Sequence, residues 1–501
     1  MTRYHNILTF ALLLAGATGC SKFLEVDNIG KSSTESFFAE LSGLESALDG
    51  LYSETFNYYD DYMNYADLAS DLVDLTPNAS ELQTDIFEFQ ALPEDNAGYP
   101  RLLWKAAYNV VTNANNILHF GPKLKESYPD DAKKIDRILG EAYFIRALMF
   151  LELSKVYSQN YTYTDDASHM GIPTPTQPLS FNATVARPTL KATYTQILED
   201  LGNARKLLAE GDPRTGGKEV YYVSDRACRA LLARVYLYMG NYEEAEKYAS
   251  EVIAEVPLTP YAEYEMMFRY PEGNPGKESI LRLSGYEKTS SLSSLYDPTN
   301  QPSAVPSQTL LALFDDPEDL RGKRLLHYDP VYEGYDDLLH GIEMDACVKY
   351  YINEKYLVDN KGLYGHVDPF VLRCSEMYLI RAEALCNRAT PDLEGAAADL
   401  KALIARATGK DVSQVTLTYS GKEEMDALIE KERMRELCFE GHRLTDITRR
   451  HQNLVRDAST TAKTTRIDYP DYRFVLPICQ LEMDSNGAMK QNPGYVGATE
   501  N

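Results

Sequence analysis

The sequence is poor in the residue types that carry most enzyme chemistry and nucleic-acid binding. It has one Trp, 8 His, and 50 Lys and Arg against 75 Asp and Glu, so its formal net charge is −25. An acidic surface repels phosphates, and we therefore exclude nucleic acid as a partner. The chain also contains no Gly-rich phosphate loop, no Gly-x-Ser-x-Gly elbow and no His-Glu-x-x-His zinc motif. These absences favour a binding protein without cofactor, metal site or catalytic residues, although the many Asp and Glu residues leave a glycosidase carboxylate pair open.

Cysteine is scarce, and its spacing fits neither a metal site nor a redox motif. No two of the 7 Cys residues form a Cys-x-x-Cys pair. Several of those after Cys20 lie in apolar helical patterns, which predicts buried free thiols, while disulfides stay the alternative for an exported chain. These residues are Cys228, Cys347, Cys374, Cys386, Cys438 and Cys479.

Long apolar runs are missing after the first 19 residues, and that N-terminal stretch is typical of a secretory signal. Arg3 precedes a short apolar run, which is followed by small residues and is too short to span a bilayer. Ala17-Thr18-Gly19-Cys20 looks like a bacterial lipobox, with Ala17 where Leu is more usual. We predict a lipoprotein signal peptide over 1–19, lipidation at Cys20 and a chain anchored to the membrane through its acyl chains. The alternative is an ordinary secreted protein with a chance Cys at its cleavage site.

Helical periodicity dominates two parts of the chain. Apolar residues recur at helical spacing over 140–157 and 194–208. The segment 227–257 resembles a tetratricopeptide helix pair, with small residues at the helix crossing and a Gly-Asn-Tyr turn at its centre. A second pair is expected over 376–406. One pair cannot bury its own apolar face, so we predict an all-α dominated fold, a tetratricopeptide-like helical-repeat scaffold with long loop-rich insertions and minor β structure.

Proline, glycine and polar residues interrupt this periodicity in three places. The longest is 258–370, and 77–100 and 158–188 are shorter. We therefore expect one domain over 20–501, with helical scaffold segments at about 34–257 and 371–450 and a loop-rich binding region at about 258–370. Long loops on a rigid scaffold are where binding sites usually lie.

A series of motifs in fixed order resembles the SusD/RagB family along nearly the whole chain. The most specific is Glu432-Arg433-Met434-Arg435-Glu436-Leu437-Cys438-Phe439-Glu440-Gly441-His442-Arg443, followed by Asp446. The aromatic residue usual before that Asp is replaced by Leu444 and Thr445. The other motifs lie at 22–26, 46–52, 104–118, 141–147, 171–173, 373–384, 476–478 and 491–495.

The resemblance implies a nutrient-binding lipoprotein on the cell outer membrane that is not an enzyme. In that family the protein captures a glycan and passes it to a SusC-like TonB-dependent transporter. The same role for peptides or another nutrient is the first alternative, and a tetratricopeptide-type adaptor is the second. The 37 Tyr residues, against 16 Phe, favour sugars because a Tyr ring offers an apolar face with a polar rim.

Ligand-binding residues are predicted from their place in loops. Our hypothesis is that the loop before the Trp104 helix and the Pro/Gly-rich region form one shallow groove, with Tyr99 or Tyr296 as a stacking platform. Trp104 itself lies in a helical pattern and is expected in the core. A second aromatic stretch, Tyr58 to Tyr65, is expected to face the transporter or the ligand. The ligand-binding candidates are Asn78, Asp95, Asn96, Tyr99, Tyr286 and Tyr296.

One set of residues near the C-terminus resembles an acid–base site. Glu440, His442 and Asp446 lie close together in sequence. Neighbouring Arg residues would lower carboxylate pKa values, which is the opposite of what a general acid needs. We interpret Glu436, Glu440, Arg443 and Asp446 as a structural ion-pair network.

Overall fold

The computed structural model describes residues 34–180, 182–270, 274–286, 288, 290–335, 341–351 and 366–496. The predicted signal peptide and the lipidation site Cys20 lie outside these residues. The longer helices are α3 (Leu41–Leu68), α5 (Tyr99–Ser127), α6 (Ala132–Tyr157), α7 (Leu190–Glu210), α8 (Asp225–Tyr238), α9 (Tyr242–Ile253), α10 (Tyr261–Arg269), α15 (Cys374–Asn387), α16 (Leu393–Thr408) and α17 (Lys422–Leu437). The shorter ones are α2 (Thr34–Phe37), α4 (Glu81–Phe87), α11 (Ser291–Tyr296), α12 (Gln308–Leu311), α13 (Pro330–Glu333), α18 (Arg443–Arg449) and α19 (Gln480–Ser485).

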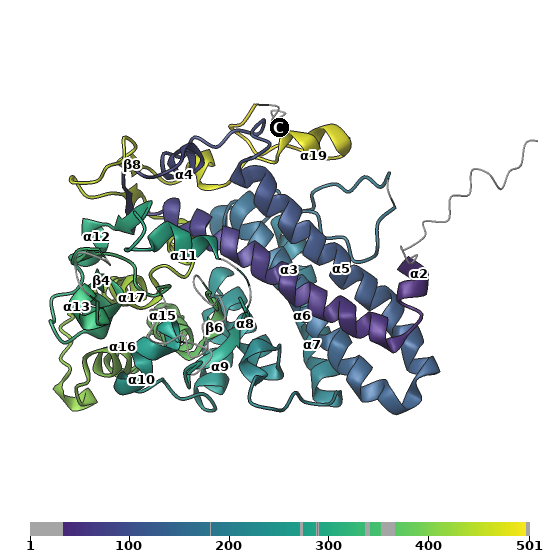
Figure 1. Ribbon diagram of the computed structural model, residues 1–501, viewed down its shortest axis with the longest axis horizontal. Coiled ribbons are helices and arrows are strands. Elements are labelled where there is room, and N and C mark those ends of the chain that lie inside the picture. Colours follow the sequence, from purple (N-terminus) through teal and green to yellow (C-terminus); the bar gives the residue numbers. More distant parts are fainter. Residues whose placement is uncertain are drawn as a thin grey trace, which may run out of the picture.

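Four long helices, α3, α5, α6 and α7, pack side by side and form one half of the scaffold (Figure 1). The central helix α6 is buried on nearly all sides, because neighbours cover it on several faces, and its buried residues include charged ones such as Glu141 and Arg146. Trp104 is buried in α5, as its helical surroundings predicted. These helices share one core with much of the rest of the chain.

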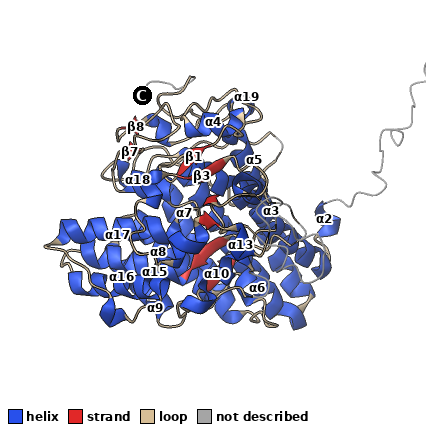
Figure 2. Ribbon diagram, turned by 60° about the vertical axis from the view of Figure 1, so that its left-hand side comes forward, coloured by secondary structure: helices blue, strands red, loops and turns tan. Residues whose placement is uncertain are grey.

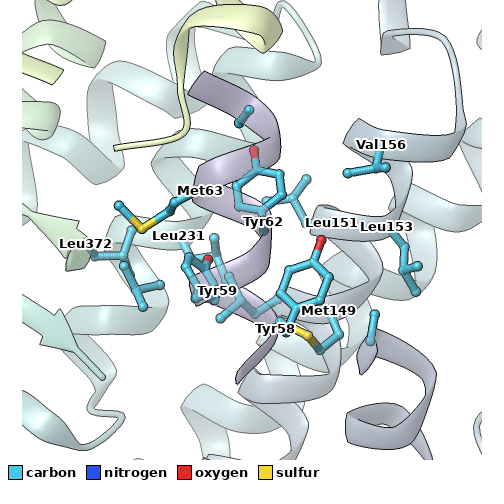
Figure 3. Packing of buried hydrophobic residues seen from close by; sticks show 14 of the residues in the cluster. Tyr58, Tyr59, Tyr62, Met63, Met149, Leu151, Leu153, Val156, Leu231 and Leu372 are labelled. Atoms are coloured by element: carbon cyan, nitrogen blue, oxygen red, sulfur yellow. The ribbon is translucent and has the colours of Figure 1, made fainter. Parts of the chain in front are cut away.

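The aromatic stretch of α3 belongs to this core. Tyr58, Tyr59, Tyr62 and Tyr65 are all buried. Figure 3 shows three of these rings among apolar side chains such as Leu151. The expectation that the Tyr side chains of this stretch face the ligand or the transporter is therefore wrong, because they recur at helical spacing and fill the interface with α6.

Both predicted tetratricopeptide-like pairs are present. The turn between α8 and α9 contains Gly240 at φ 71°, a conformation that favours Gly. The Asn241 side chain then accepts a hydrogen bond from the Glu244 backbone N–H and caps α9. In the second pair, Asp392 caps α16 in the same way. The fold class is confirmed: the scaffold is helix-dominated and its strands are few and short.

The strands of the described chain form four two-stranded antiparallel sheets. In Figure 2 most of the strands lie between the helices, and one sheet lies nearer the C-terminal end. Two of the sheets join the described part of 258–370 to the helical scaffold, one beyond α3 and one before α15. The pairs are β1 (Val73–Leu75) with β3 (Ala304–Pro306), β2 (Ser279–Arg282) with β6 (Phe370–Arg373), β4 (His327–Tyr328) with β5 (Met344–Asp345), and β7 (Leu454–Val455) with β8 (Arg466–Ile467).

The segment 77–100, predicted as a loop, contains the helix α4. Ser80 accepts a hydrogen bond from the Gln83 backbone N–H, and the Gln83 side chain accepts one from the Ser80 N–H. This capping box is a sequence signal of a helix start, and it stands in the sequence as Ser-x-x-Gln.

The six cysteines after Cys20 are buried and free, as predicted. Cys228 shows the consequence: burial raises the pKa of its thiol above the ordinary value. A buried protonated thiol behaves as a small apolar side chain. Within the described residues, no helix is both long and apolar enough to cross a membrane.

Candidate functional site

The acid–base set near the C-terminus is buried and paired, as the structural interpretation predicted. Arg433 donates two hydrogen bonds to the Asp446 carboxylate, each at 3.0 Å. Burial alone would raise the pKa of Asp446, but the charges of Arg433 and Arg449 outweigh it and hold that pKa well below its ordinary value. Burial and nearby cations lower the pKa of His442, which keeps its ring neutral. Such a set stabilises structure and has no access to substrate.

The four residues predicted as one network lie in three clusters. Glu436 accepts from Arg373 at 2.6 Å and from Arg406 at 2.5 Å. Glu440 joins this cluster through Arg373 at 2.8 Å. Arg443 instead pairs with Asp71 at 2.8 Å, far from it in sequence. The Arg partners from other helices were not predictable, because sequence spacing does not show which helices meet.

The predicted ligand-binding residues differ widely in exposure. Asn78 and Asn96 are exposed, and Asp95 is half-buried. Tyr286 is 48% exposed and offers a free ring surface. Tyr99 is only 6% exposed, with its ring centroid 6.1 Å from that of Tyr65.

Tyr296 is not a stacking platform. Its side chain is 1% exposed, and its hydroxyl donates to the Asp67 carboxylate at 3.0 Å. Its ring packs against Phe439, with centroids 5.1 Å apart. The prediction failed because a Tyr in a Pro-rich region is not exposed when a distant helix covers it. Burial excludes Tyr99 as a platform for the same reason.

The two predicted loops nevertheless meet on α3. The Asp60 carboxylate accepts from the Ser291 backbone N–H at 2.8 Å, and Lys288 donates to the Asn57 side chain at 3.0 Å. On the other side, Tyr99 lies close enough to Asp61 for burial, together with the Asp61 and Asp60 charges, to raise the pKa of its hydroxyl. We call this surface the α3 strip. It consists of Asn57, Asp60, Asp61 and Lys288. We assign Tyr286 to it from its place two residues before Lys288; the Tyr286 ring lies beside that of His366, with centroids 6.2 Å apart.

Asp61 is the chemically available group of the α3 strip. It is half-buried and has no hydrogen-bond or ion-pair partner among the described residues. Burial and the Asp60 charge raise its pKa to about 6. A desolvated carboxylate without a partner is a strong acceptor for a ligand hydroxyl. The sequence shows the Asp60-Asp61 pair among tyrosines, but it does not show that Asp61 is partly exposed.

Two of the hollows outside the α3 strip are large by volume. The first, of about 700 Å³, is lined by α4, the following loop and the C-terminal segment, and contains Asp95 beside Tyr472, which is 42% exposed. The sequence did not predict an exposed ring at Tyr472. Its one local indication is that this aromatic residue stands between the charged residues Asp471 and Arg473. The second, about 470 Å³, lies between α5, residues of 173–179 and 183–185, and α19, and we call it the α5 hollow. Within the described ranges, no group of three or more His, Cys, Asp or Glu is placed to hold a metal ion.

A helical-repeat scaffold with buried ion pairs and polar surface sites is typical of binding proteins. Similar proteins identify the family more closely. Residues 22–237 match the family described as starch-binding and associating with the outer membrane, and residues 339–495 match the SusD family. A SusD-like protein of Formosa agariphila is 26% identical, in an alignment that covers 97% of this chain and 99% of that protein.

Solved structures agree in fold. A SusD superfamily protein of Bacteroides thetaiotaomicron is 27% identical, covers 90% of this chain and 99% of its own, and has a TM-score of 0.75. A laminarin-binding SusD-like protein is 21% identical, covers 91% and 99%, and has a TM-score of 0.68, a likeness of fold alone. The chain belongs to the SusD/RagB family.

Proposed function

We propose that this protein captures a glycan at the cell surface and passes it to a SusC-like TonB-dependent transporter. The observation that carries the proposal is family membership over both halves of the chain, one half matching a family described as starch-binding and associating with the outer membrane. Cys20 carries the lipid anchor in this proposal, and the mature chain lies on the outer membrane. Several acyl chains hold a protein far more firmly than one.

The glycan binds at the α3 strip. Tyr286 presents its ring to the C–H face of a sugar, and the Asp61 and Asn57 side chains take the ring hydroxyls. An aromatic face beside polar groups is the arrangement that recognises a sugar, which has both kinds of surface. The Tyr ring also loses little conformational entropy on binding, which favours affinity.

The protein binds without turnover. The His442 motif is buried and its carboxylates are committed to Arg partners, so it has no role in bond cleavage. The described part of the chain offers Asp61 beside Asp60, but Asp60 already accepts from Ser290 and Ser291. A carboxylate held in this way lacks the freedom of a general base or a nucleophile.

A binding screen tests the ligand class. The chain from Ser21 onward is titrated with polysaccharides, oligosaccharides and a peptide mixture by affinity gel electrophoresis and calorimetry. Binding of one glycan without product release supports the proposal. Binding of peptides alone would mean that the protein has the same role for peptides. Binding of neither glycans nor peptides, together with capture of a folded protein, would favour an adaptor. Turnover of any ligand would overturn the claim that the protein is no enzyme.

Single variants test the site. We expect Tyr286→Ala and Asp61→Asn each to weaken glycan binding about tenfold or more, because an aromatic ring that the ligand covers and a desolvated acceptor dominate such sites. Tyr163→Ala is the matched control, since Tyr163 is exposed and lies outside the α3 strip. Unchanged affinity in both site variants would place the ligand elsewhere.

The anchor and the transporter need their own experiments. Cys20→Ala should release the protein from the outer membrane fraction while glycan binding in solution stays intact. Retention of that variant in the membrane would contradict lipidation. Co-purification of the tagged wild type in mild detergent should recover a TonB-dependent β-barrel, and recovery of the protein alone would count against the partner.

A further inference from the structure

The α5 hollow shares no lining residue with the α3 strip and has a different chemistry. Its α5 wall carries Arg101, Trp104, Lys105 and Tyr108, and its α19 wall carries Glu482. Its volume of about 470 Å³ lies in the range of small-molecule sites.

Two cations of this hollow have no acidic partner. Arg101 and Lys105 lie one turn apart on α5, and neither forms an ion pair with a described residue. Arg101 donates only to the backbone carbonyl of Asn96, at 2.9 Å. Most other Arg side chains of this acidic protein are paired with carboxylates. An unpaired cation pair at a cavity wall therefore points to an anion from outside.

The one carboxylate among the lining residues is already engaged. Glu482 accepts from the Trp104 indole N–H at 3.3 Å through one oxygen and from the Asn486 side-chain amide at 3.1 Å through the other. It holds α19 against α5 and does not neutralise Arg101 or Lys105. The lining thus has two cations against one carboxylate.

The rest of the lining suits a sugar better than an inorganic ion. Leu179 and Leu481 are 54% and 44% exposed at the hollow, which gives it apolar surface. Asn109 and Gln177 add amide groups that donate and accept hydrogen bonds. An ion alone would leave the apolar surface uncovered, whereas a sugar ring covers it.

We propose that the α5 hollow binds an acidic sugar unit, a uronate, whose carboxylate lies between Arg101 and Lys105. The side chains Asn109 and Gln177 take its hydroxyls, and Leu481 packs on its ring. The net charge of −25 does not prevent this, because at 0.15 M ionic strength charges beyond about 8 Å are largely screened. A guanidinium also binds a carboxylate with two parallel hydrogen bonds. This site goes beyond the proposed function and does not depend on the α3 strip.

The test compares a trigalacturonate with its methyl ester, which has the same skeleton without the charges. Calorimetry of the chain from Ser21 onward at 50 mM salt should show the acid binding about tenfold or more tightly than the ester. We expect Arg101→Gln/Lys105→Gln to abolish this preference. Lys105→Gln alone, at an exposed position that tolerates change, should reduce it about threefold.

Two controls separate this site from general charge and from the α3 strip. Lys123→Gln removes an exposed charge from the same helix outside the hollow and should leave the preference intact. Tyr286→Ala should also leave the preference for the acid intact, while it weakens the binding of a ligand at the α3 strip. Equal binding of acid and ester, survival of the preference in the double variant, or its loss in Lys123→Gln would each overturn the proposal. Glycan binding in the screen that does not depend on Tyr286 or Asp61 would instead count against the α3 strip, and binding of no glycan at all would count against the proposed function.

Discussion

The two halves of the scaffold are held together by different forces. In the first half, α3, α5, α6 and α7 bury an apolar core, part of which Figure 3 shows. Its ion pairs form small groups, such as Arg146 with Asp200 at 2.6 Å and Glu141 with Arg137 and Arg214. In the second half, α15, α16 and α17 share a small apolar cluster. Outside that cluster, the buried carboxylate of Glu436 in α17 forms ion pairs with three Arg side chains.

The difference shows what each kind of contact fixes. Apolar burial is strong but not directional, so it holds long helices together without specifying each contact. A buried ion network is directional, because every charge needs its partners in place. In the second half this network connects α17 to Arg321 and Lys349 of the loop-rich region and to Glu278 through Arg373. Charges therefore help to position the loop-rich region, whose described part also contributes buried side chains such as Leu281, Leu295 and Tyr296 to the core.

Breaking the network should have the largest effect. Glu436→Gln leaves three buried Arg side chains without their shared carboxylate, and we expect a loss of about 3–5 kcal/mol in the free energy of unfolding. Hydrogen exchange should rise first in α15–α17 and in the strand before α15. The matched control is Glu423→Gln at an exposed position of the same helix, which should change little. Equal loss of protection in α6 would contradict separate stabilisation of the halves.

A truncation in the first half should cost somewhat less. Leu151 is fully buried in α6, and Leu151→Ala should lower the free energy of unfolding by about 3 kcal/mol, since the cavity adds to the lost apolar burial. Urea denaturation measures it. Because no charge is stranded, the loss should not depend on pH between 5 and 8. A pH-dependent loss would show that ion pairs carry this half too.

The junction of the halves should be sensitive to pH. Asp67, at the end of α3, has its pKa raised to about 7 by burial, which the Tyr296 hydrogen bond and the Lys349 charge offset only in part. The folded state then binds more protons than the unfolded state between about pH 4 and 7, so stability falls as pH rises through this window. From pH 5 to 8 the wild type should lose on the order of 2–3 kcal/mol relative to Asp67→Asn. Parallel melting curves for both proteins would disprove the raised pKa.

The smallest effect comes from one hydroxyl in each half. Tyr58 and Tyr264 are both fully buried, but the Tyr58 hydroxyl has no hydrogen-bond partner, whereas that of Tyr264 donates to Glu436 at 3.1 Å. Tyr58→Phe should be neutral or stabilising, and Tyr264→Phe should cost about 1–2 kcal/mol. Chemical denaturation of the two variants gives the comparison. A change in the free energy of unfolding of the same sign and size in both variants would contradict the contrast between the halves.

Much of the scaffold was predictable because its signals are local. The apolar spacing of α6 and α7, the Gly240 turn and the burial of Trp104 follow from residues within one or two helical turns. The capping box of α4 was local as well, and reading it would have corrected the prediction of a loop. Family motifs placed the whole in the SusD/RagB family.

Burial of loop residues was not predictable. Tyr296 and Tyr286 stand ten residues apart in the same Pro/Gly-rich stretch, yet one donates to Asp67 from the core and the other is exposed. No periodicity in that stretch separates them. The predicted binding residues therefore remain predictions, with Tyr286 retained for the α3 strip and Tyr296 assigned to the core.

The sequence by itself determined the helical-repeat class and the structural nature of the His442 motif, because each rests on residue type and short-range spacing. It favoured free thiols but left disulfides open. The tertiary structure alone decided which side chains meet: Arg373 with Glu436, Asp61 with Tyr99, and two unpaired cations around one hollow. The physical reason is that burial and charge pairing depend on contacts between segments tens to hundreds of residues apart, such as Asp71 and Arg443. Chain spacing does not encode such distances, and only the packed helices bring those groups together.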